Sequence, residues 1–318
     1  MKSERRMSKS NNKAIQRKKN THGDNRDTVP EKDPGRLAVL KTIEQLELEG
    51  RFDEDAEDDP PTIPLEPDQI DYLRRKPVSK IKARAAYALA ETFVDGLVRH
   101  GKLVIKGVNG LENLNGVKSG AVITCNHFNP FDCFTVEKVF RNSVHYKKKT
   151  LYKVIREGNY TNFPGLYGFL FRNCDTLPLS QNKKTMYNFL KAVDTILQRG
   201  DFILIYAEQS LWWNYRKPKP LKNGAFKFAV KNKVPVIPIF ITMEDSERIG
   251  SEGFPIQKYT VFIEKPVYPD QSLTERQQVD DMRNKNYNVW KQIYEDFYGV
   301  PLTYTTKSPH NGNITGLS

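Results

Sequence analysis

The chain has 318 residues, enough for one large domain or two smaller ones, and its formal net charge of +12 favours an anionic partner: nucleic acid, an acidic membrane face or a phosphate substrate. Its three cysteines, Cys125, Cys133 and Cys174, are scattered and lack metal-site spacing, so neither a disulfide framework nor a cysteine metal site is expected, and a reducing compartment is favoured. No run approaches the roughly 20 apolar residues of a membrane span, and no apolar core follows the basic N-terminus, so we expect neither a transmembrane segment nor a secretory signal.

The N-terminal part is predicted to hold little packed structure. Residues 1–35 are basic and polar without apolar periodicity, which predicts a disordered arm. Residues 36–78 are predicted to form a short helix followed by an acidic, proline-containing linker. The acidic run at 53–59 is interpreted as solvated, because its carboxylates have no fixed frame for a metal ion.

Residues 79–100 predict an amphipathic helix. Arg84, Glu91, Asp95 and Arg99 fall on one narrow stripe, and the remainder is mostly apolar. So wide an apolar arc indicates packing on a protein core, contact with lipid, or both.

From residue 101 to 298 the pattern predicts one α/β domain. Apolar runs predict strands near 103–108, 121–125, 202–207, 235–241 and 259–264. Helical periodicity appears near 131–141, 182–198, 220–231 and 274–298. This alternation predicts a sheet flanked by helices, and residues 299–318 are predicted to be a polar tail.

The most informative motif follows the second predicted strand. His127 stands five residues before Asp132, with an Asn-Pro turn between them. An imidazole can take a proton from a substrate hydroxyl while a carboxylate holds its tautomer, so the nucleophile would belong to the substrate. A second copy of the spacing, His22 and Asp27, lies in the polar arm and is interpreted as chance.

The cysteines on either side of the motif, Cys125 and Cys133, offer two interpretations. The simpler is that both are small buried apolar side chains. The alternative is a Cys–His nucleophile pair.

Asn126-His127-x4-Asp132 resembles the first signature block of the glycerolipid acyltransferases, the 1-acylglycerol-3-phosphate and glycerol-3-phosphate acyltransferases. Three further segments follow in the family's order, and the likeness covers roughly residues 100–245. Residues 168–172 are similar to the second block and residues 206–210 to the third; residues 221–226 and 234–238 resemble the Lys-x-Gly segment and the fourth block.

The resemblance implies that His127 is the general base and Asp132 its orienting carboxylate. It also implies a set of substrate-binding residues: Asn126, Arg172, Glu208, Gln209, Ser210, Arg216, Lys222 and Gly224. The third block departs from the family, because Gln209 replaces a glycine and Leu211 replaces an arginine. Arg216 is the next cation along the chain and is predicted to supply the missing charge.

The basic run at 216–222 has no acidic neighbour in the sequence. It is predicted to meet lipid phosphates or an acidic acyl carrier, or to be a solvated loop.

The implied activity is O-acyl transfer from acyl-CoA or acyl-ACP to the hydroxyl of a lysophosphatidate-like acceptor, in phospholipid biosynthesis. The implied fold is glycerol-3-phosphate acyltransferase-like. The resemblance implies no metal or other cofactor, an anionic membrane surface as partner and no nucleic acid, at the cytoplasmic face of the cell membrane. Two alternatives stay open: a different lipid acceptor or water, and a non-enzymatic protein that binds anionic lipid or nucleic acid.

Overall fold

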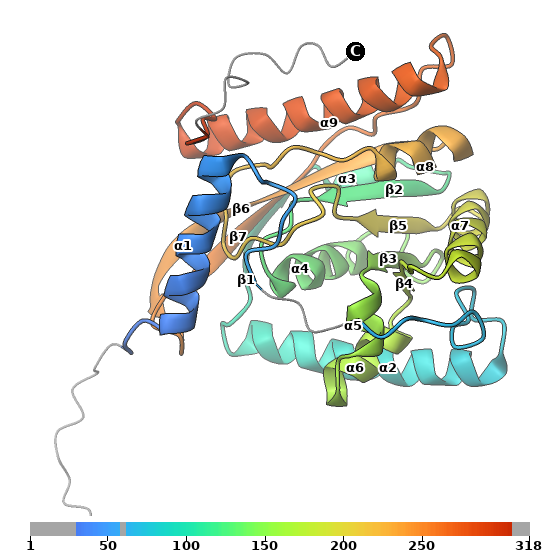
Figure 1. The fold of residues 1–318 in the computed structure, drawn as a ribbon, viewed down its shortest axis with the longest axis horizontal. Helices are drawn as coiled ribbons and strands as arrows, with labels where there is room; N and C mark the ends of the chain where they lie inside the picture. Colours follow the sequence, from blue (N-terminus) through green and yellow to red (C-terminus); the bar gives the residue numbers. More distant parts are fainter. Residues whose placement is uncertain (1–29, 58–61, 307–318) are drawn as a thin grey trace, which may run out of the picture.

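The computed structural model describes residues 30–57 and 62–306. The predicted basic arm up to residue 29, its His22–Asp27 pair and residues 307–318 of the predicted tail lie outside this part. Figure 1 shows a central sheet with helices packed on both faces. The predicted α/β class, a sheet flanked by helices, is confirmed.

The described residues form a seven-stranded sheet in the order β1-β7-β6-β2-β5-β3-β4. Only β6 and β7 pair antiparallel; the other neighbours are parallel. Strands β6, β2, β5, β3 and β4 therefore end at one common edge of the sheet. The strands are β1 (Val104–Asn109), β2 (Ala121–Cys125), β3 (Leu151–Ile155), β4 (Thr176–Pro178), β5 (Phe202–Ile205), β6 (Val236–Ile249) and β7 (Pro255–Ile263).

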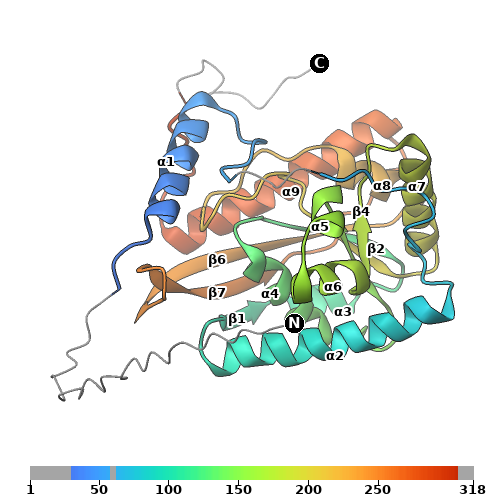
Figure 2. The ribbon, with the colours of Figure 1, turned by 60° about the horizontal axis from the view of Figure 1, so that its bottom comes forward.

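Two apolar cores cover the two faces of the sheet. Parallel strands buried on both faces are apolar throughout, and every residue of β2 and β5 is buried. One core joins the sheet to α7 (Lys183–Gln198), α8 (Gly224–Asn232) and α9 (Glu275–Tyr298). The other joins it to α2 (Pro77–Arg99), α3 (Leu111–Asn115) and α4 (Pro130–Arg141), as Figure 2 shows for α2 and α4.

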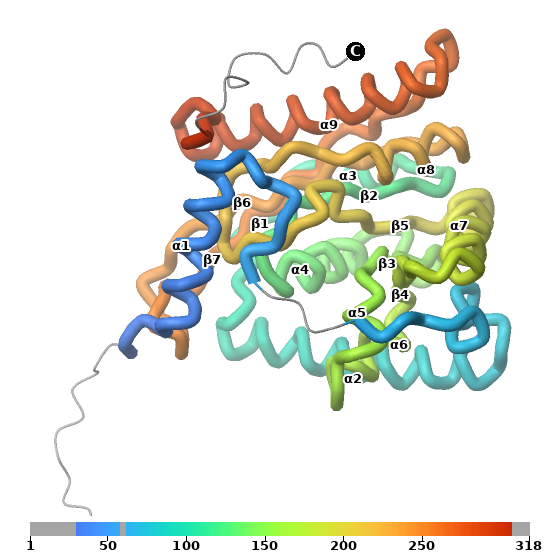
Figure 3. Tube along the Cα trace, viewed as in Figure 1, coloured from blue at the N-terminus to red at the C-terminus, as the bar shows by residue number. Residues whose placement is uncertain are grey.

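The N-terminal helix α1 (Pro34–Glu49) packs apart from these cores. Its Ile43 and Leu46 form a third apolar cluster with Ala56, Trp212 and Trp213. Figure 3 shows α1 at the edge of the sheet where β5 ends. Helix α1 thus lies against the loop that follows β5.

Several short elements are absent from the sequence prediction. These are β3, β4, α3, α5 (Glu157–Thr161) and α6 (Gly165–Asn173). Strand β6 also runs eight residues past its predicted end. This extension pairs with β7 as a two-stranded ribbon, and its polar, exposed residues lack the apolar run on which the prediction was based. Helix α2 begins two residues earlier than predicted, at Pro77.

Helix α2 has two apolar faces. Ala83, Ala86 and Val94 are buried toward the domain, whereas Ile81 is 65% exposed and Leu89 is 47% exposed. Within residues 30–57 and 62–306, no helix has both the length and the apolar character to cross a bilayer.

Candidate active site

The loop after β2 carries the His–Asp motif and is fixed to β6. The Asn126 side chain donates to the Ile241 carbonyl at 3.0 Å and accepts from the Ile241 N–H at 2.8 Å. Asn126 is only 2% exposed, so its amide is occupied by the backbone of the neighbouring strand. Asn126 therefore braces the loop against β6, and its predicted contact with substrate stays a prediction.

The first turn of α4 places Asp132 back toward His127. Asn129 caps the helix by accepting from the Phe131 N–H at 2.8 Å, Pro130 begins the helix, and Asp132 completes a capping box at the third position. A carboxylate in the first helical turn is favoured by the helix dipole. The four residues between His127 and Asp132 are thus a cap and a helix start, which explains their spacing.

Asp132 is a fully buried carboxylate whose oxygens are satisfied by donors. Its Oδ2 lies 2.8 Å from His127 Nδ1 and accepts from the backbone N–H groups of Phe128 at 3.0 Å and Asn129 at 3.3 Å. Its Oδ1 accepts from the Tyr206 hydroxyl at 2.6 Å. This partner assigns the proton of the His127 ring to Nδ1 and leaves the lone pair on Nε2.

The His127 imidazole is partly exposed and has one nitrogen without a hydrogen bond within the described residues. Its side chain is 23% exposed, and within the described residues Nε2 makes no hydrogen bond. The Tyr206 ring stacks on it with centroids 3.9 Å apart and planes inclined by 20°. Nε2 is therefore placed to accept a proton from an incoming group.

Tyr206 is a site residue that sequence reasoning quoted but did not assign a role. Burial, followed by the nearby Asp132 charge, raises the pKa of Tyr206 well above its usual value, so the hydroxyl remains a donor. The available signal was its position directly after β5, the neighbour of β2 in the sheet.

Glu208 supports the backbone of the motif. Its Oε2 accepts from the His127 N–H at 3.0 Å and its Oε1 accepts from the Lys219 N–H at 2.8 Å. Burial raises the pKa of Glu208, and the Lys219 charge opposes that rise. The structure brings Glu208 to the His127–Asp132 pair, where it positions the backbone; its predicted contact with substrate stays a prediction.

Lys219 is a buried cation beneath this loop. Its side chain is 1% exposed, and its Nζ donates to the carbonyl and hydroxyl oxygens of Ser210, each at 2.7 Å. Burial lowers the pKa of Lys219 to about 8, against the favourable charge of Glu208, whose Oε2 lies 3.6 Å away.

The remaining third-block residues shape a tight turn. Gln209 has φ of 67°, in the left-handed region, where the family usually carries glycine. Ser210 is fully buried, and its hydroxyl donates to the Phe52 carbonyl at 2.6 Å. The hydroxyl of Ser210 is thus used within the protein, which differs from its predicted substrate contact.

The acidic segment, residues 51–57, lies on this turn. Of the run at 53–59 that was predicted to be solvated, Asp53, Glu54 and Glu57 are exposed, Asp55 is held by other segments, and residues 58 and 59 lie outside the described part. The Asp55 carboxylate accepts from the Leu211 N–H at 3.1 Å and pairs with Arg156. The Trp212 indole N–H donates to the Glu54 carbonyl at 2.7 Å.

Lys222 and Gly224 lie at the start of α8. Lys222 donates its backbone N–H to Ala207 at 2.8 Å, and its Nζ pairs with Asp53 at 2.8 Å. Gly224 is the first residue of α8 and is surrounded by open space. Lys222 joins the acidic segment to the third-block loop.

The structure does not bring Arg216 to the catalytic pair. Its guanidinium pairs with Asp245 at 2.7 Å and donates to Gln257 at 3.4 Å. Asp245 lies four residues beyond Ile241 on β6, roughly 13 Å further along the strand from the contact with Asn126. Arg216 is therefore held on the β6–β7 ribbon and does not replace the arginine missing at Leu211.

The basic run around Arg216 has acidic neighbours in space. Lys217 pairs with Glu47 of α1 at 2.7 Å, so tertiary contacts, which the sequence does not show, neutralise this part of the run. The predicted contact with external phosphates loses its main support.

Arg172 is also used within the protein. Its guanidinium donates to the carbonyls of Tyr160 at 3.1 Å and Phe163 at 3.3 Å. A Cβ at Gly168 would lie 1.7 Å from the same Phe163 carbonyl, which explains the glycine. The second block thus fixes the α5–α6 turn, and the predicted binding of acceptor phosphate by Arg172 stays a prediction.

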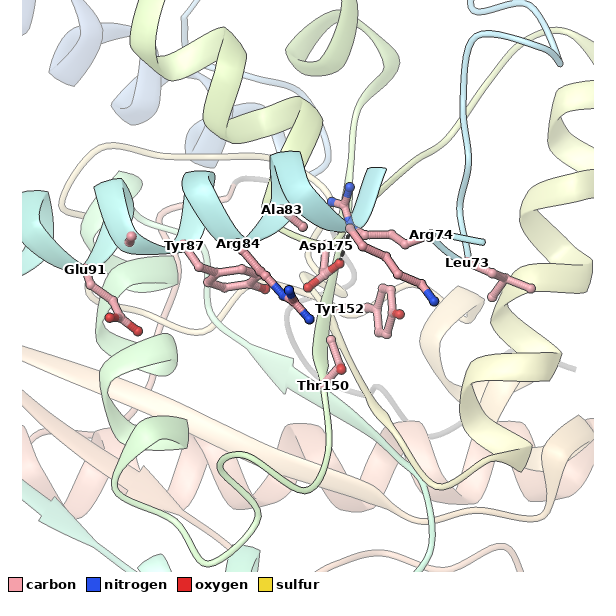
Figure 4. Close-up of a pocket in the computed structure, with 11 residues that line it drawn as sticks. Leu73, Arg74, Ala83, Arg84, Tyr87, Glu91, Thr150, Tyr152 and Asp175 are labelled. Atoms are coloured by element: carbon pink, nitrogen blue, oxygen red, sulfur yellow. Dashed lines mark hydrogen bonds and ion pairs between the residues drawn. The ribbon is translucent and has the colours of Figure 1, made fainter. Parts of the chain in front are cut away.

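A hollow of about 530 Å³ opens beneath α2, away from the catalytic pair. Figure 4 shows Arg74 and Asp175 joined across it, with Tyr152 at its wall. Thr150 and Tyr152 lie at the start of β3, whereas His127 follows the end of β2, which runs parallel. The hollow is therefore at the opposite edge of the sheet from the proposed chemistry.

The cysteines do not provide a nucleophile. Cys125 is fully buried, and burial raises its pKa well above the usual value. Burial raises the pKa of Cys133 to about 12. Burial thus disfavours the thiolate of both side chains, which argues against the Cys–His alternative. Across residues 30–57 and 62–306, no group of three or more His, Cys, Asp or Glu side chains is placed to hold a metal ion.

Comparison with known proteins gives one family match. Residues 106–242 match the model of the family described as Acyltransferase. Among solved structures, the chain is similar to the crystal structure of the 1-acyl-sn-glycerophosphate (LPA) acyltransferase PlsC from Thermotoga maritima, at 17% identity and a TM-score of 0.48, covering 73% of this chain and 87% of that chain. A search of curated proteins found no match.

Proposed function

We propose that this chain, which carries an Acyltransferase-family domain over residues 106–242, is an O-acyltransferase of phospholipid biosynthesis. It moves a fatty acyl group from acyl-CoA or acyl-ACP to the hydroxyl of a lysophosphatidate-like acceptor, 1-acyl-sn-glycerol-3-phosphate. The observation that carries the proposal is the His127 ring: its Nδ1 is fixed by Asp132, its side chain is 23% exposed, and its Nε2 makes no hydrogen bond within the described residues.

The geometry supports a direct transfer without a covalent enzyme intermediate. His127 Nε2 takes the proton of the acceptor hydroxyl while the hydroxyl oxygen attacks the thioester carbonyl carbon. The carbon–sulfur bond then breaks, and the leaving thiolate receives the proton from His127, which returns to its neutral form. Asp132 stabilises the imidazolium between these steps, and base catalysis of this kind contributes typically about 10²–10⁴-fold.

The protein groups around the pair keep the ring in place during both proton transfers. Tyr206 stacks on the imidazole and holds Asp132 Oδ1, and Glu208 holds the His127 backbone. Cys125, the thiol next to the motif, does not favour a competing protein nucleophile, because it is fully buried and burial raises its pKa well above the usual value.

A second candidate is an acyltransferase with another lipid acceptor, or a hydrolase that uses water. Leu211 stands where the family carries an arginine, and Arg216 is held by Asp245. Neither residue offers the acceptor phosphate a cation.

The proposal includes a peripheral position at the cytoplasmic face of the membrane, with anionic lipid as partner and no nucleic acid. The exposed apolar residues of α2 and the neighbouring α6 support it, because Ile81, Leu166 and Tyr167 are each at least 46% exposed. Basic residues such as Lys80 and Lys82 are exposed on the same helix and would face anionic headgroups.

The test is a transfer assay with purified protein, acyl-CoA and acyl-ACP as donors, and a panel of lysolipids read by mass spectrometry. We expect product from lysophosphatidate and its loss in a folded His127→Ala variant. Transfer only to other lysolipids, or release of free fatty acid, would favour the second candidate. Activity of His127→Ala within tenfold of wild type would refute the assignment of the base.

A truncation tests the non-enzymatic alternative. A chain that lacks residues 1–30 should keep its transfer activity if catalysis resides in the α/β domain. A binding role housed in the basic arm would be lost in the same truncation.

A further inference from the structure

Asp55 of the acidic segment occupies a position beside the catalytic pair. The Leu211 N–H donates to one of its oxygens at 3.1 Å, and the Arg156 guanidinium pairs with the other. Arg156 also donates to the Gln209 carbonyl at 3.0 Å. The carboxylate of Asp55 is thus bound by a backbone N–H and a guanidinium at once.

The groups that bind Asp55 lie at the functional edge of the sheet. Arg156 is the first residue after β3, and Leu211 lies in the loop after β5, the adjacent parallel strand. Ligands of open α/β sheets bind at the carboxyl ends of such strands. Trp212, next to Leu211, donates its backbone N–H to the His127 carbonyl at 3.4 Å, so the bound carboxylate is close to the proposed base.

A guanidinium beside a backbone N–H recognises phosphate oxygens as well as carboxylate oxygens. The neighbouring cations of this loop are engaged elsewhere: Lys219 is buried against Glu208 and Ser210, and Lys222 pairs with Asp53. Arg156 is 42% exposed, so its guanidinium can also meet a ligand from solution.

We propose that Arg156 and the Leu211 N–H form a subsite for a phosphate ester of the substrate, and that Asp55 occupies this subsite as an internal competitor. The inference rests on the proposed function, because it assigns the anion-binding part of that same site. Phosphate esters occur in both the lysophosphatidate acceptor and the CoA donor, and the experiment separates these sources.

The contacts permit the carboxylate to leave without unfolding the acidic segment. Phe52 stacks on Trp212 with centroids 5.6 Å apart, and Ala56 is buried, so the segment is anchored on both sides of Asp55. The Asp55 side chain is 23% exposed, and ion pairs that reach solvent are weak. A phosphate monoester carries about −1.5 to −2 charges and is a stronger ligand for the same donors.

The test compares Asp55→Asn, Arg156→Gln and Glu54→Gln. The asparagine keeps an acceptor for the Leu211 N–H but removes the charge. Glu54 lies on the same segment, and its carboxylate pairs with Arg51 instead, so Glu54→Gln is the matched control. The probes are short-chain lysophosphatidate and the monoacylglycerol of the same chain, with acyl-CoA and the phosphate-free acyl-N-acetylcysteamine thioester as donors.

We expect Asp55→Asn to lower the KM of one phosphate-bearing substrate about 3- to 10-fold with kcat unchanged, because the competing closed form is removed. Arg156→Gln should raise that KM about 10-fold or more, through loss of a charge-assisted hydrogen bond. The KM of the phosphate-free partner substrate should not change in either variant. The control Glu54→Gln should leave the KM of the phosphate-bearing substrate unchanged. A shift with lysophosphatidate assigns the subsite to the acceptor, and a shift with acyl-CoA assigns it to the donor.

Calorimetric binding of the same four compounds separates this inference from the proposed function, since it needs no turnover. If transfer is absent but Asp55→Asn binds a phosphate-bearing compound more tightly than wild type, the subsite stands and the proposed function fails. Unchanged or weaker binding in Asp55→Asn, with a melting temperature like that of wild type, would overturn the inference. An equal gain in binding affinity for the phosphate-free monoacylglycerol would also overturn the inference.

Discussion

The Tyr206 hydroxyl is predicted to support catalysis through Asp132, and Tyr206→Phe isolates it. The substitution removes only the oxygen that donates to Asp132 Oδ1 at 2.6 Å, and it keeps the ring that stacks on His127. Asp132 is fully buried, so bulk solvent does not reach its carboxylate to replace the lost donor. The carboxylate keeps three donors, all on Oδ2.

The expected size follows from that geometry. A hydrogen bond to a charged, buried acceptor contributes about 1.5–3 kcal/mol, so the free energy of unfolding should fall by about that amount. If the same hydrogen bond holds Asp132 against the imidazolium of the transition state, kcat falls about 10- to 100-fold, at about 1.36 kcal/mol for each factor of ten. The KM values of donor and acceptor should change little, because Tyr206 supports Asp132 and not the substrate.

The assay is steady-state transfer with both substrates varied, together with urea unfolding. Tyr298→Phe is the matched control, since its hydroxyl accepts from the Met243 N–H at 2.9 Å and donates to the Met243 carbonyl at 3.1 Å, away from the motif. The control should lose stability and keep kcat. A Tyr206→Phe variant with the same pattern as the control would show that the hydroxyl stabilises the fold alone, and the reasoning would be wrong.

Two further predictions concern Lys219 and helix α2. Burial lowers the pKa of Lys219 from 10.5 to about 8, so the unfolded chain binds the Lys219 proton more tightly than the folded chain does. This difference lowers the free energy of unfolding, fully so below pH 8, and the loss is relieved as the pH rises toward 10.5. The free energy of unfolding of wild type relative to Lys219→Met should therefore rise by about 1–2 kcal/mol between pH 8 and 9.5, and a difference independent of pH would contradict this. Ile81→Asp and Leu89→Asp should reduce sedimentation with anionic vesicles without changing the fold, because both side chains are exposed apolar groups of α2. Val300→Asp is the control, since Val300 is as exposed as Leu89 but lies outside α2, and it should sediment like wild type. Equal sedimentation of all three variants would show that α2 does not contact the membrane.

The strands at the centre of the sheet could be predicted because burial on both faces leaves a plain apolar signal. Strand β2 was predicted at its observed bounds, and β5 was predicted with two extra residues. Strand β3 was missed because Lys153 interrupts its apolar run; the lysine is buried and pairs with Glu137 of α4 at 2.6 Å. A buried ion pair is a tertiary fact, and local periodicity contains no sign of it.

The contact between His127 and Asp132 could be predicted because its geometry is local. A helix cap and one turn bring Asp132 back to His127. For Asn126 and Glu208 the sequence suggested substrate contacts and showed no sign of the hydrogen bonds that both make within the protein, since their partners are backbone groups of other segments. Asp55 had no local signal at all, because its partner Leu211 is 156 residues away in the sequence.

The strand order of the sheet explains why the signature blocks come together in space. Strands β2, β5 and β3 are neighbours in space and parallel, so the loops that follow them meet at one edge although other elements separate them in the sequence. His127 belongs to the first of these loops, Tyr206 and Leu211 to the second, and Arg156 to the third. Sequence blocks can therefore identify the loops, but the missing arginine at Leu211 shows their limit. Which cation reaches the site depends on the strand order, and that order places Arg156 beside Leu211 while it holds Arg216 on the β6–β7 ribbon.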